Sequence, residues 1–199
     1  MPNIILMNKW QQNIRDLSAL LENLSVRDPQ GTDLNANEGF VRLAELTLQV
    51  NSEGGTIYFL GNGASASMAS HFSADMAKTG GIRTMVFTDI SLLTAVANDV
   101  SYEDVYAEPL KWYMKSKDMV VAISSSGNSP NIVRAVHQAK ELGGTVITIS
   151  AMKEDNAIRK LGDLNFHVAA KTYGLAETAH AAILHYWMDI VESKRKKRR

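Results

Sequence analysis

Residues 119–131 read MVVAISSSGNSPN, an apolar run that ends in four serines, one glycine and two asparagines. Such a continuous apolar run is typical of a strand buried on both faces of a parallel sheet. A helix is expected to follow, because Pro130 suits the first helical position and Ser129 the cap before it. A cap explains one serine but leaves three others without a structural role, namely Ser124, Ser125 and Ser126. Their hydroxyls, next to the free amides of a helix N-terminus, predict a phosphate site.

The segments on either side repeat this change from an apolar strand to a helix. We expect further strands in TIYFLG, which ends at residue 61, and in 83–89, 145–150 and 164–170. Helices are expected at 5–25, 38–52, 65–78, 90–97, 102–115 with a break or kink at Pro109, 129–143, 155–161 and 175–194. The residues between the first two helices, 27–39, are interpreted as a polar turn.

This alternation predicts one α/β sandwich, a parallel sheet covered by helices on both faces. With 199 residues the chain is long enough for one well-filled core. We divide it into an N-terminal helical extension (1–54), the α/β domain (55–193) and a basic tail (194–199).

The composition excludes or disfavours several classes of function. The chain is 45% apolar and 21% charged and has no cysteine, which excludes disulfides and thiolate metal sites and suits a reducing cytoplasm. We therefore expect a cytoplasmic protein without a membrane span. Six of the 21 basic residues lie in the tail KRKKRR, so the remainder carries 15 basic and 21 acidic residues. This excess of acidic residues before the tail argues against nucleic acid as the main ligand. The tail itself is interpreted as a solvent-exposed end of the last helix.

A second polar loop, GNGASAS at 61–67, follows the strand that begins near residue 56. Ligands of open α/β sheets collect at the carboxyl ends of strands, which makes Asn62, Gly63 and Ser65 candidate ligand residues. GNGASA also fits the dinucleotide pattern G-x-G-x-x-A, with Asp89 at the end of the next strand as a ribose-binding acid. An oxidoreductase of that kind would not need a second hydroxyl-rich loop, and we expect no nucleotide cofactor.

Two helices each offer a carboxylate and an imidazole. His71 and Asp75 stand four residues apart, and the last helix has the pattern E-x-x-H-x-x-x-x-H formed by Glu177, His180 and His185. Residues eight apart differ by about 80° of helical arc, so Glu177 and His185 are able to face one cleft. The four groups without His180 suit a divalent metal such as zinc, and equally suit proton transfer to and from a substrate. His137 and His167 are interpreted as packed or solvated residues.

With these motifs, the chain resembles SIS-domain (sugar isomerase) proteins of the phosphoheptose isomerase family from about residue 55 to 192. The resemblance rests on GNGASAS, HFSAD, FTDISLLTAVANDVSYEDVYAEPL, ISSSGNSPNIVRAV and the spaced C-terminal histidines. It implies a flavodoxin- or Rossmann-like single SIS domain in a homotetramer whose sites are shared between subunits. The helices of residues 1–54 would then serve oligomerisation.

The resemblance also implies roles for single residues. Asn62, Gly63, Ser65, Asp89, Ser124, Ser125, Ser126, Ser129 and Glu177 are expected to bind substrate. Asp75 and His185 are the expected acid–base pair, and zinc is expected at His71, Asp75, Glu177 and His185. The chain departs from the family where Asp75 replaces a usual glutamate, Glu177 a glutamine and Leu175 an arginine.

The function implied is conversion of sedoheptulose 7-phosphate to D-glycero-D-manno-heptose 7-phosphate through an enediol, in heptose precursor biosynthesis. The departures at Asp75 and Glu177 favour an alternative, a non-enzymatic SIS-domain sensor of sugar phosphates or a scaffold that associates with the replication initiator. The retained carboxylate and imidazole groups favour the enzyme.

Overall fold

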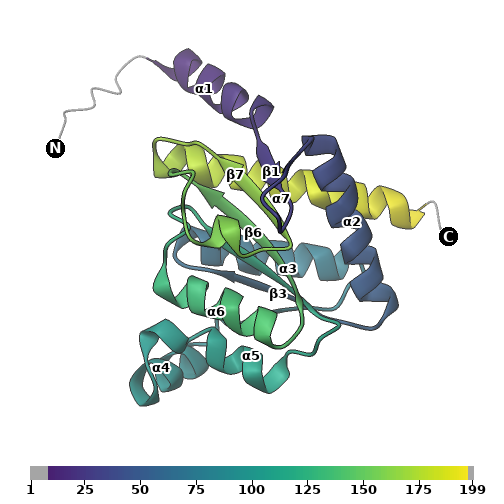
Figure 1. The fold of residues 1–199 in the computed structure, drawn as a ribbon, viewed down its shortest axis with the longest axis vertical. Coiled ribbons are helices and arrows are strands. Elements are labelled where there is room, and N and C mark those ends of the chain that lie inside the picture. The colour runs from purple at the N-terminus through teal and green to yellow at the C-terminus, as the bar shows by residue number, and fades with distance from the viewer. Residues whose placement is uncertain (1–8, 197–199) are drawn as a thin grey trace.

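The computed structural model describes residues 9–196 (Figure 1). Its helices are α1 (Trp10–Glu22), α2 (Ala36–Ser52), α3 (Ala64–Lys78), α4 (Ile90–Asp99), α5 (Ala107–Tyr113), α6 (Pro130–Glu141) and α7 (Tyr173–Lys196), and η1 (Tyr102–Asp104) and η2 (Ile158–Lys160) are short 3-10 turns. The strands are β1 (Ser25–Arg27), β2 (Asp33–Leu34), β3 (Ile57–Gly61), β4 (Thr84–Val86), β5 (Met119–Ser124), β6 (Thr145–Ala151) and β7 (Leu164–Val168).

These strands form one sheet in the order β2-β1-β7-β6-β5-β3-β4. The strands from β3 to β7 pair in parallel, as their continuous apolar sequences predict. β3 lies beside β5, with Gly61 paired to Ile123, so the two polar loops that follow these strands leave the sheet side by side. The fold thereby confirms the predicted α/β sandwich with its parallel sheet.

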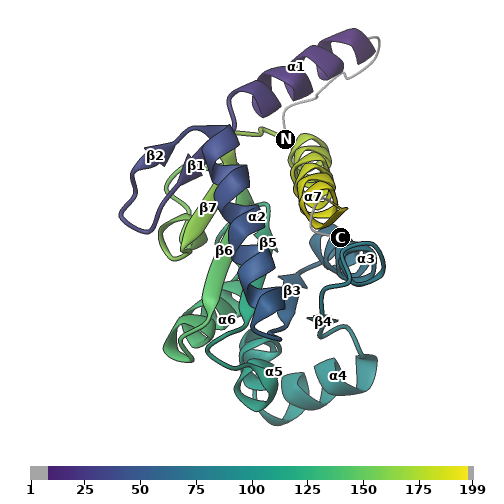
Figure 2. The same ribbon diagram turned by 90° about the vertical axis from the view of Figure 1, so that its right-hand side faces the viewer.

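Helices cover both faces of the sheet (Figure 2). Alternate residues of β3 separate the two cores: Ile57 and Phe59 pack with α2, α3 and α7, while Tyr58 and Leu60 pack with α4, α5 and α6. This alternation follows from the period of two in a strand. Because each face carries its own apolar core, the strand ends keep fixed positions relative to the helices that follow them.

The interpretation of residues 27–39 as a turn was wrong, because part of this segment extends the sheet. β1 pairs antiparallel with β7 and with β2, which makes this edge of the sheet mixed. The Asp28 carboxylate accepts hydrogen bonds from the amides of Gln30 (2.9 Å) and Thr32 (2.8 Å) and closes the hairpin. Strands of three and two residues are too short to show a period in the sequence, although Val26 is fully buried.

Other expected boundaries shift by a few residues. The predicted helix at 102–115 divides into η1 and α5, and the interruption precedes Pro109, which lies in the first turn of α5. Only η2 forms within the predicted helix at 155–161. The expected first helix at 5–25 is described as α1, and its residues 5–8 lie outside the described part of the chain.

Elements from before residue 55 share the core of the domain. α2 packs on α7, and β1 belongs to the sheet, whereas α1 projects from the helical layer and contacts α7 (Figure 2). Of the tail, residues 194–196 continue α7 and residues 197–199 lie outside the described range. Within residues 9–196, no helix is both long enough and apolar enough to cross a membrane.

Candidate active site

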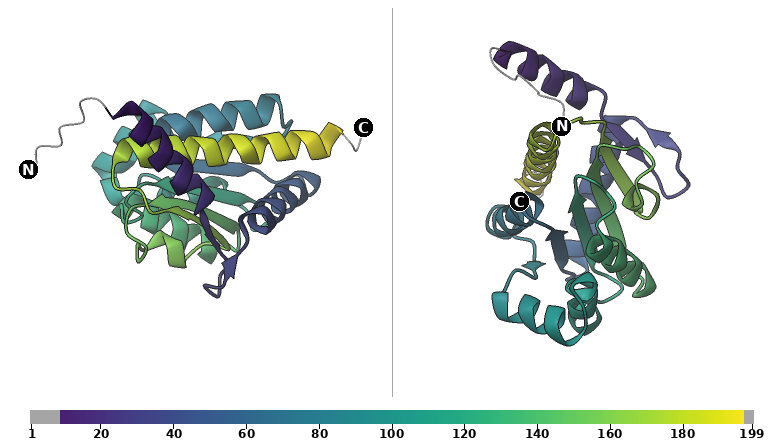
Figure 3. Two further views of the ribbon diagram at one scale, coloured as in Figure 1. Left: turned by 90° about the horizontal axis from the view of Figure 1, so that it is seen from above. Right: turned by 90° about the vertical axis from the view of Figure 1, so that its left-hand side faces the viewer.

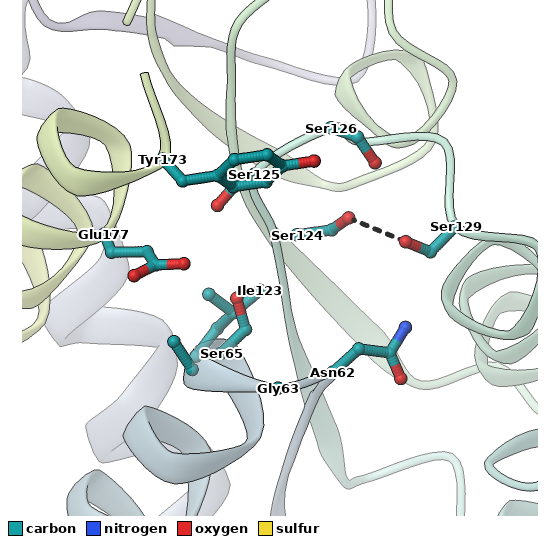
Figure 4. A pocket seen from close by; sticks show the side chains of 11 residues that line it. Asn62, Gly63, Ser65, Ile123, Ser124, Ser125, Ser126, Ser129, Tyr173 and Glu177 are labelled. Atoms are coloured by element: carbon teal, nitrogen blue, oxygen red, sulfur yellow. Dashed lines mark hydrogen bonds between the residues drawn. The ribbon is translucent and has the colours of Figure 1, made fainter.

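The carboxyl ends of β3 and β5 and the start of α7 enclose a cavity of about 290 Å³ (Figure 4). This is the edge at which parallel sheets collect their ligands. The lining residues are Asn62, Gly63, Ala64, Ser65, Ile123, Ser124, Ser125, Ser126, Ser129, Tyr173 and Glu177. The structure therefore brings both predicted polar loops and Glu177 into one cavity.

The serine loop, residues 124–129, turns its hydroxyls toward this cavity. Ser129 caps α6, but its side chain makes no capping hydrogen bond and its Oγ lies 3.5 Å from Ser124 Oγ. The Ser124 hydroxyl also accepts a hydrogen bond from the Gly127 amide at 3.2 Å. Capping thus does not occupy the Ser129 hydroxyl, which remains available to a ligand at the N-terminus of α6.

The end of β6 and the segment that follows it support the backbone of the serine loop. The Ala151 amide donates to the Ser125 carbonyl, and the Ile158 amide to the Gly127 carbonyl, both at 3.1 Å. Gly127 has φ +64° and leaves no room for a side chain, because a Cβ there would lie 2.0 Å from Asn156 Oδ1. These contacts fix the backbone of the loop without using the serine hydroxyls.

The first loop is held by different groups. The Tyr106 hydroxyl donates to the Gly61 carbonyl, and burial raises the pKa of Tyr106 to about 12. Asn62 was predicted to bind substrate, but its amide is hydrogen-bonded to Asn131 and turned away from Glu177 (Figure 4). Gly63, with φ +55°, and the buried Ser65 line the cavity as the sequence predicts.

The opposite wall comes from the first turns of α7. Glu177 is the one charged group among the described lining residues, and Figure 4 shows it across the cavity from Ser129. Tyr173, four residues earlier, lines the cavity and is 62% exposed. The sequence reasoning missed Tyr173, although an aromatic residue one helical turn before a candidate acid was a usable signal.

His71, Asp75 and His185 lie together, but outside the lining of this cavity. His71 Nε2 is 3.3 Å from Asp75 Oδ2, and the ring centroids of His71 and His185 are 5.8 Å apart. α3 and α7 pack against each other along this contact (Figure 3), with His71 and His185 exposed. The predicted contact between residues four apart on α3 is confirmed, whereas Glu177 faces the cavity and not this cluster.

The expected zinc site can be compared with this geometry. Imidazole nitrogens and carboxylate oxygens are suitable zinc ligands. Within residues 9–196, however, no three His, Asp or Glu side chains lie close enough together to hold a metal ion. The arrangement therefore does not fit a four-ligand zinc site, and zinc at His71, Asp75, Glu177 and His185 stays a prediction.

Two further residues considered in the sequence, Asp89 and His180, lie outside the lining of the cavity. The Asp89 carboxylate caps α4 by accepting a hydrogen bond from the Leu92 amide at 2.9 Å, so its role toward a substrate stays a prediction. His180 is fully buried in the core, and neither ring nitrogen has a hydrogen-bond partner. Burial lowers the pKa of His180 to about 4, as it does for His167.

Comparison with known proteins identifies the family to which the chain belongs. Residues 32–151 match the model of the SIS domain. A phosphoheptose isomerase of Thermodesulfovibrio yellowstonii is 33% identical over 156 residues, which cover 75% of this chain and 77% of the relative. The chain belongs to the phosphoheptose isomerase family. The solved structure of the phosphoheptose isomerase of Neisseria gonorrhoeae is similar, with a TM-score of 0.79, 29% identity, and coverage of 91% of this chain and 94% of that one.

The same fold also occurs outside this family of isomerases. The structure of the Vibrio vulnificus NanR protein complexed with ManNAc-6P matches with a TM-score of 0.65 and 15% identity, over 94% of this chain and 61% of that one. At that identity the likeness shows the fold alone. The family membership rests on the isomerases.

Proposed function

We propose that the protein is an aldose–ketose isomerase that interconverts sedoheptulose 7-phosphate and D-glycero-D-manno-heptose 7-phosphate, in heptose precursor biosynthesis. One observation carries the proposal: a cavity lined by four serine-loop serines opens beside two helices that bear His71, Asp75, Glu177 and His185. The names of the relatives supply the seven-carbon sugar.

The phosphate would bind at the serine loop. The hydroxyls of Ser124, Ser126 and Ser129 and the N-terminus of α6 offer hydrogen bonds and a favourable dipole to an anion. Glu177 is on the far side of the cavity, where its charge repels a phosphate least and its oxygens accept hydrogen bonds from sugar hydroxyls. This polarity orients the substrate with its phosphate toward Ser129.

The length of the substrate agrees with a reaction near the histidine cluster. An extended chain of eight bonds, from the phosphorus of a 7-phosphate to C1, spans about 10 Å at the rise per bond of an extended backbone. Ser65 lines the cavity, and His71 follows it by six residues, about 9 Å along α3. The length of the sugar is thus similar to the stretch of α3 between the cavity lining and His71, which is consistent with a reaction of C1 and C2 between α3 and α7.

The reaction moves one proton between carbons and one between oxygens. A base removes a proton from C1 of the ketose while the C2 oxygen gains one, which gives a cis-enediol. Loss of the proton on the C1 oxygen and protonation of C2 then yield the aldose. We assign Asp75 as the carbon base and His185 as its partner at oxygen, because a carboxylate and an imidazole are suited to these transfers.

A homotetramer would complete this arrangement. α1 has no buried residue, and Trp10 and Ile14 are 68% and 46% exposed. We propose that α1 packs against other copies of the chain, and that a neighbouring copy covers the exposed cluster of His71 and His185. Zinc at His71, Asp75, Glu177 and His185 would require these side chains to move together, because within residues 9–196 no three of them lie close enough to hold a metal ion. Measurement of bound metal in the purified protein tests this prediction independently of activity.

Substitution of His185 by glutamine tests the assignment. We expect His185→Gln to lose about 10²-fold or more of the turnover, the usual contribution of a general acid or base, and to retain binding of sedoheptulose 7-phosphate. Binding is measured by calorimetry and turnover by the appearance of the aldose. Near-normal turnover in the variant would refute the role of His185. His137→Gln makes the same substitution at an exposed histidine of α6 outside the cavity lining and serves as the control.

A further inference from the structure

The two loops of the cavity are joined by a pair of side-chain amides. Asn62 Nδ2 donates to Asn131 Oδ1, and Asn131 Nδ2 donates to Asn62 Oδ1, each at 2.9 Å. Asn62 lies in the first loop after β3, and Asn131 lies in the first turn of α6, directly after the serine loop. The pair thus connects segments that are 69 residues apart in the sequence.

The chemistry of this pair restricts both positions. Each carboxamide supplies one donor and one acceptor, so the two groups satisfy each other only if both are amides in this orientation. Asn131 is 2% exposed and does not line the cavity, which leaves it no solvent as an alternative partner. Loss of the Asn62 amide would leave the buried Asn131 side chain unpaired, with the free-energy penalty that follows, and loss of the Asn131 amide would leave the half-buried Asn62 side chain without the partner that orients it.

The first loop also has little freedom of its own. The Tyr106 hydroxyl bonds to the Gly61 carbonyl, and a Cβ at Gly61 would lie 2.6 Å from the carbonyl carbon of Ser65. These contacts hold the loop against α3 and α5, but they do not reach the serine loop. The amide pair is the side-chain hydrogen-bonded link between the two loops in the described part of the chain.

We propose that Asn131 is a positioning residue, which acts through Asn62 to set the separation of the two loops that hold a sugar phosphate. Asn62 then serves the site by its bond to Asn131 rather than by a side-chain contact with the substrate. The inference rests on the proposed function, because it takes a ligand that spans both loops. It predicts that the pair matters for a sugar phosphate and not for inorganic phosphate, which needs the serine loop alone.

A double-mutant cycle tests this. Asn62→Ala, Asn131→Ala and the double variant are titrated with sedoheptulose 7-phosphate and with inorganic phosphate. We expect each single variant to weaken sugar-phosphate binding about tenfold, the scale of one or two lost hydrogen bonds, with phosphate binding unchanged. The double variant should resemble either single one, because residues that act as a unit are not additive. Asn131→Ser replaces Asn131→Ala if the latter does not fold.

Asn165 provides a matched control. It is also buried and bonded through its amide, to Gly162 and Thr148, but it lies on β7 away from the cavity. Asn165→Ala should lower the melting temperature and leave the ratio of the two affinities unchanged. Additive losses in the cycle, or equal losses for both ligands, would overturn the proposal. Wild-type binding without turnover would overturn the proposed reaction alone, and no sugar-phosphate binding would overturn both.

Discussion

Replacement of Gly127 by alanine probes the support of the serine loop most sharply. Gly127 has φ +64°, a left-handed conformation, and its added Cβ would lie 2.0 Å from Oδ1 and 2.3 Å from Cγ of Asn156. Asn156 is 1% exposed and is anchored by a 2.7 Å hydrogen bond from its Nδ2 to the Lys153 carbonyl. It therefore has little room to move, and the serine loop must shift instead.

The expected loss of stability in Gly127→Ala has two contributions. A left-handed conformation costs an L-residue roughly 1–2 kcal/mol relative to glycine. Overlap in a packed interior costs a further 1–3 kcal/mol or so. These two penalties together should reduce the free energy of unfolding of Gly127→Ala by roughly 2–5 kcal/mol. For a chain of this length, the melting temperature then falls by roughly 5–20 °C.

Gly31→Ala separates the two parts. Gly31 has φ +82°, but nothing lies within 4 Å of its added Cβ, so only the backbone penalty applies there. Melting temperatures of both variants are measured by calorimetry, and inorganic phosphate binding by titration. We expect the larger destabilisation and a weakened phosphate affinity in Gly127→Ala alone. Equal destabilisation, or unchanged phosphate affinity in Gly127→Ala, would refute the reasoning.

Three further predictions concern pH, the cavity wall and assembly. Burial lowers the pKa of His167 and His180 from 6.5 to about 4, so the unfolded chain binds more protons between these values. The free energy of unfolding should therefore be highest above pH 6.5 and decrease by about 3 kcal/mol per histidine as the pH falls toward 4. Urea unfolding of His167→Gln across this range should show a shallower dependence on pH. Glu177→Gln should reduce turnover and leave inorganic phosphate binding intact; weakened phosphate binding would contradict the orientation proposed for the substrate. Trp10→Ser with Ile14→Ser should lower the oligomeric state in light scattering, whereas an unchanged mass would exclude α1 from the interface.

The parallel sheet and its two polar loops were predictable because their signals are local. Apolar runs such as 119–124 report burial on both faces, and glycines and serines at their ends report a ligand edge. The hairpin of β1 and β2 escaped prediction because its strands are too short to carry a period. Its stability comes from pairing with β7, which is about 140 residues further along the chain.

The candidate site was only partly predictable, for a related reason. Sequence spacing placed Glu177 and His185 on one helix, but it could not show that one faces the cavity and the other packs against His71 and Phe72. The pairing of Asn62 with Asn131 was likewise invisible, since the pattern of each loop indicates polarity and not the partner. Helical and strand periods define a face, and tertiary packing determines what that face contacts.

The most direct test of the central claim is turnover of sedoheptulose 7-phosphate by the purified protein. The protein is first freed of metal with a chelator and then assayed with and without added zinc, with the aldose product followed over time. We expect formation of D-glycero-D-manno-heptose 7-phosphate, and faster turnover with added zinc would support the predicted metal site. Sugar-phosphate binding with no aldose under either condition would contradict the isomerase and favour a sensing role for the same cavity.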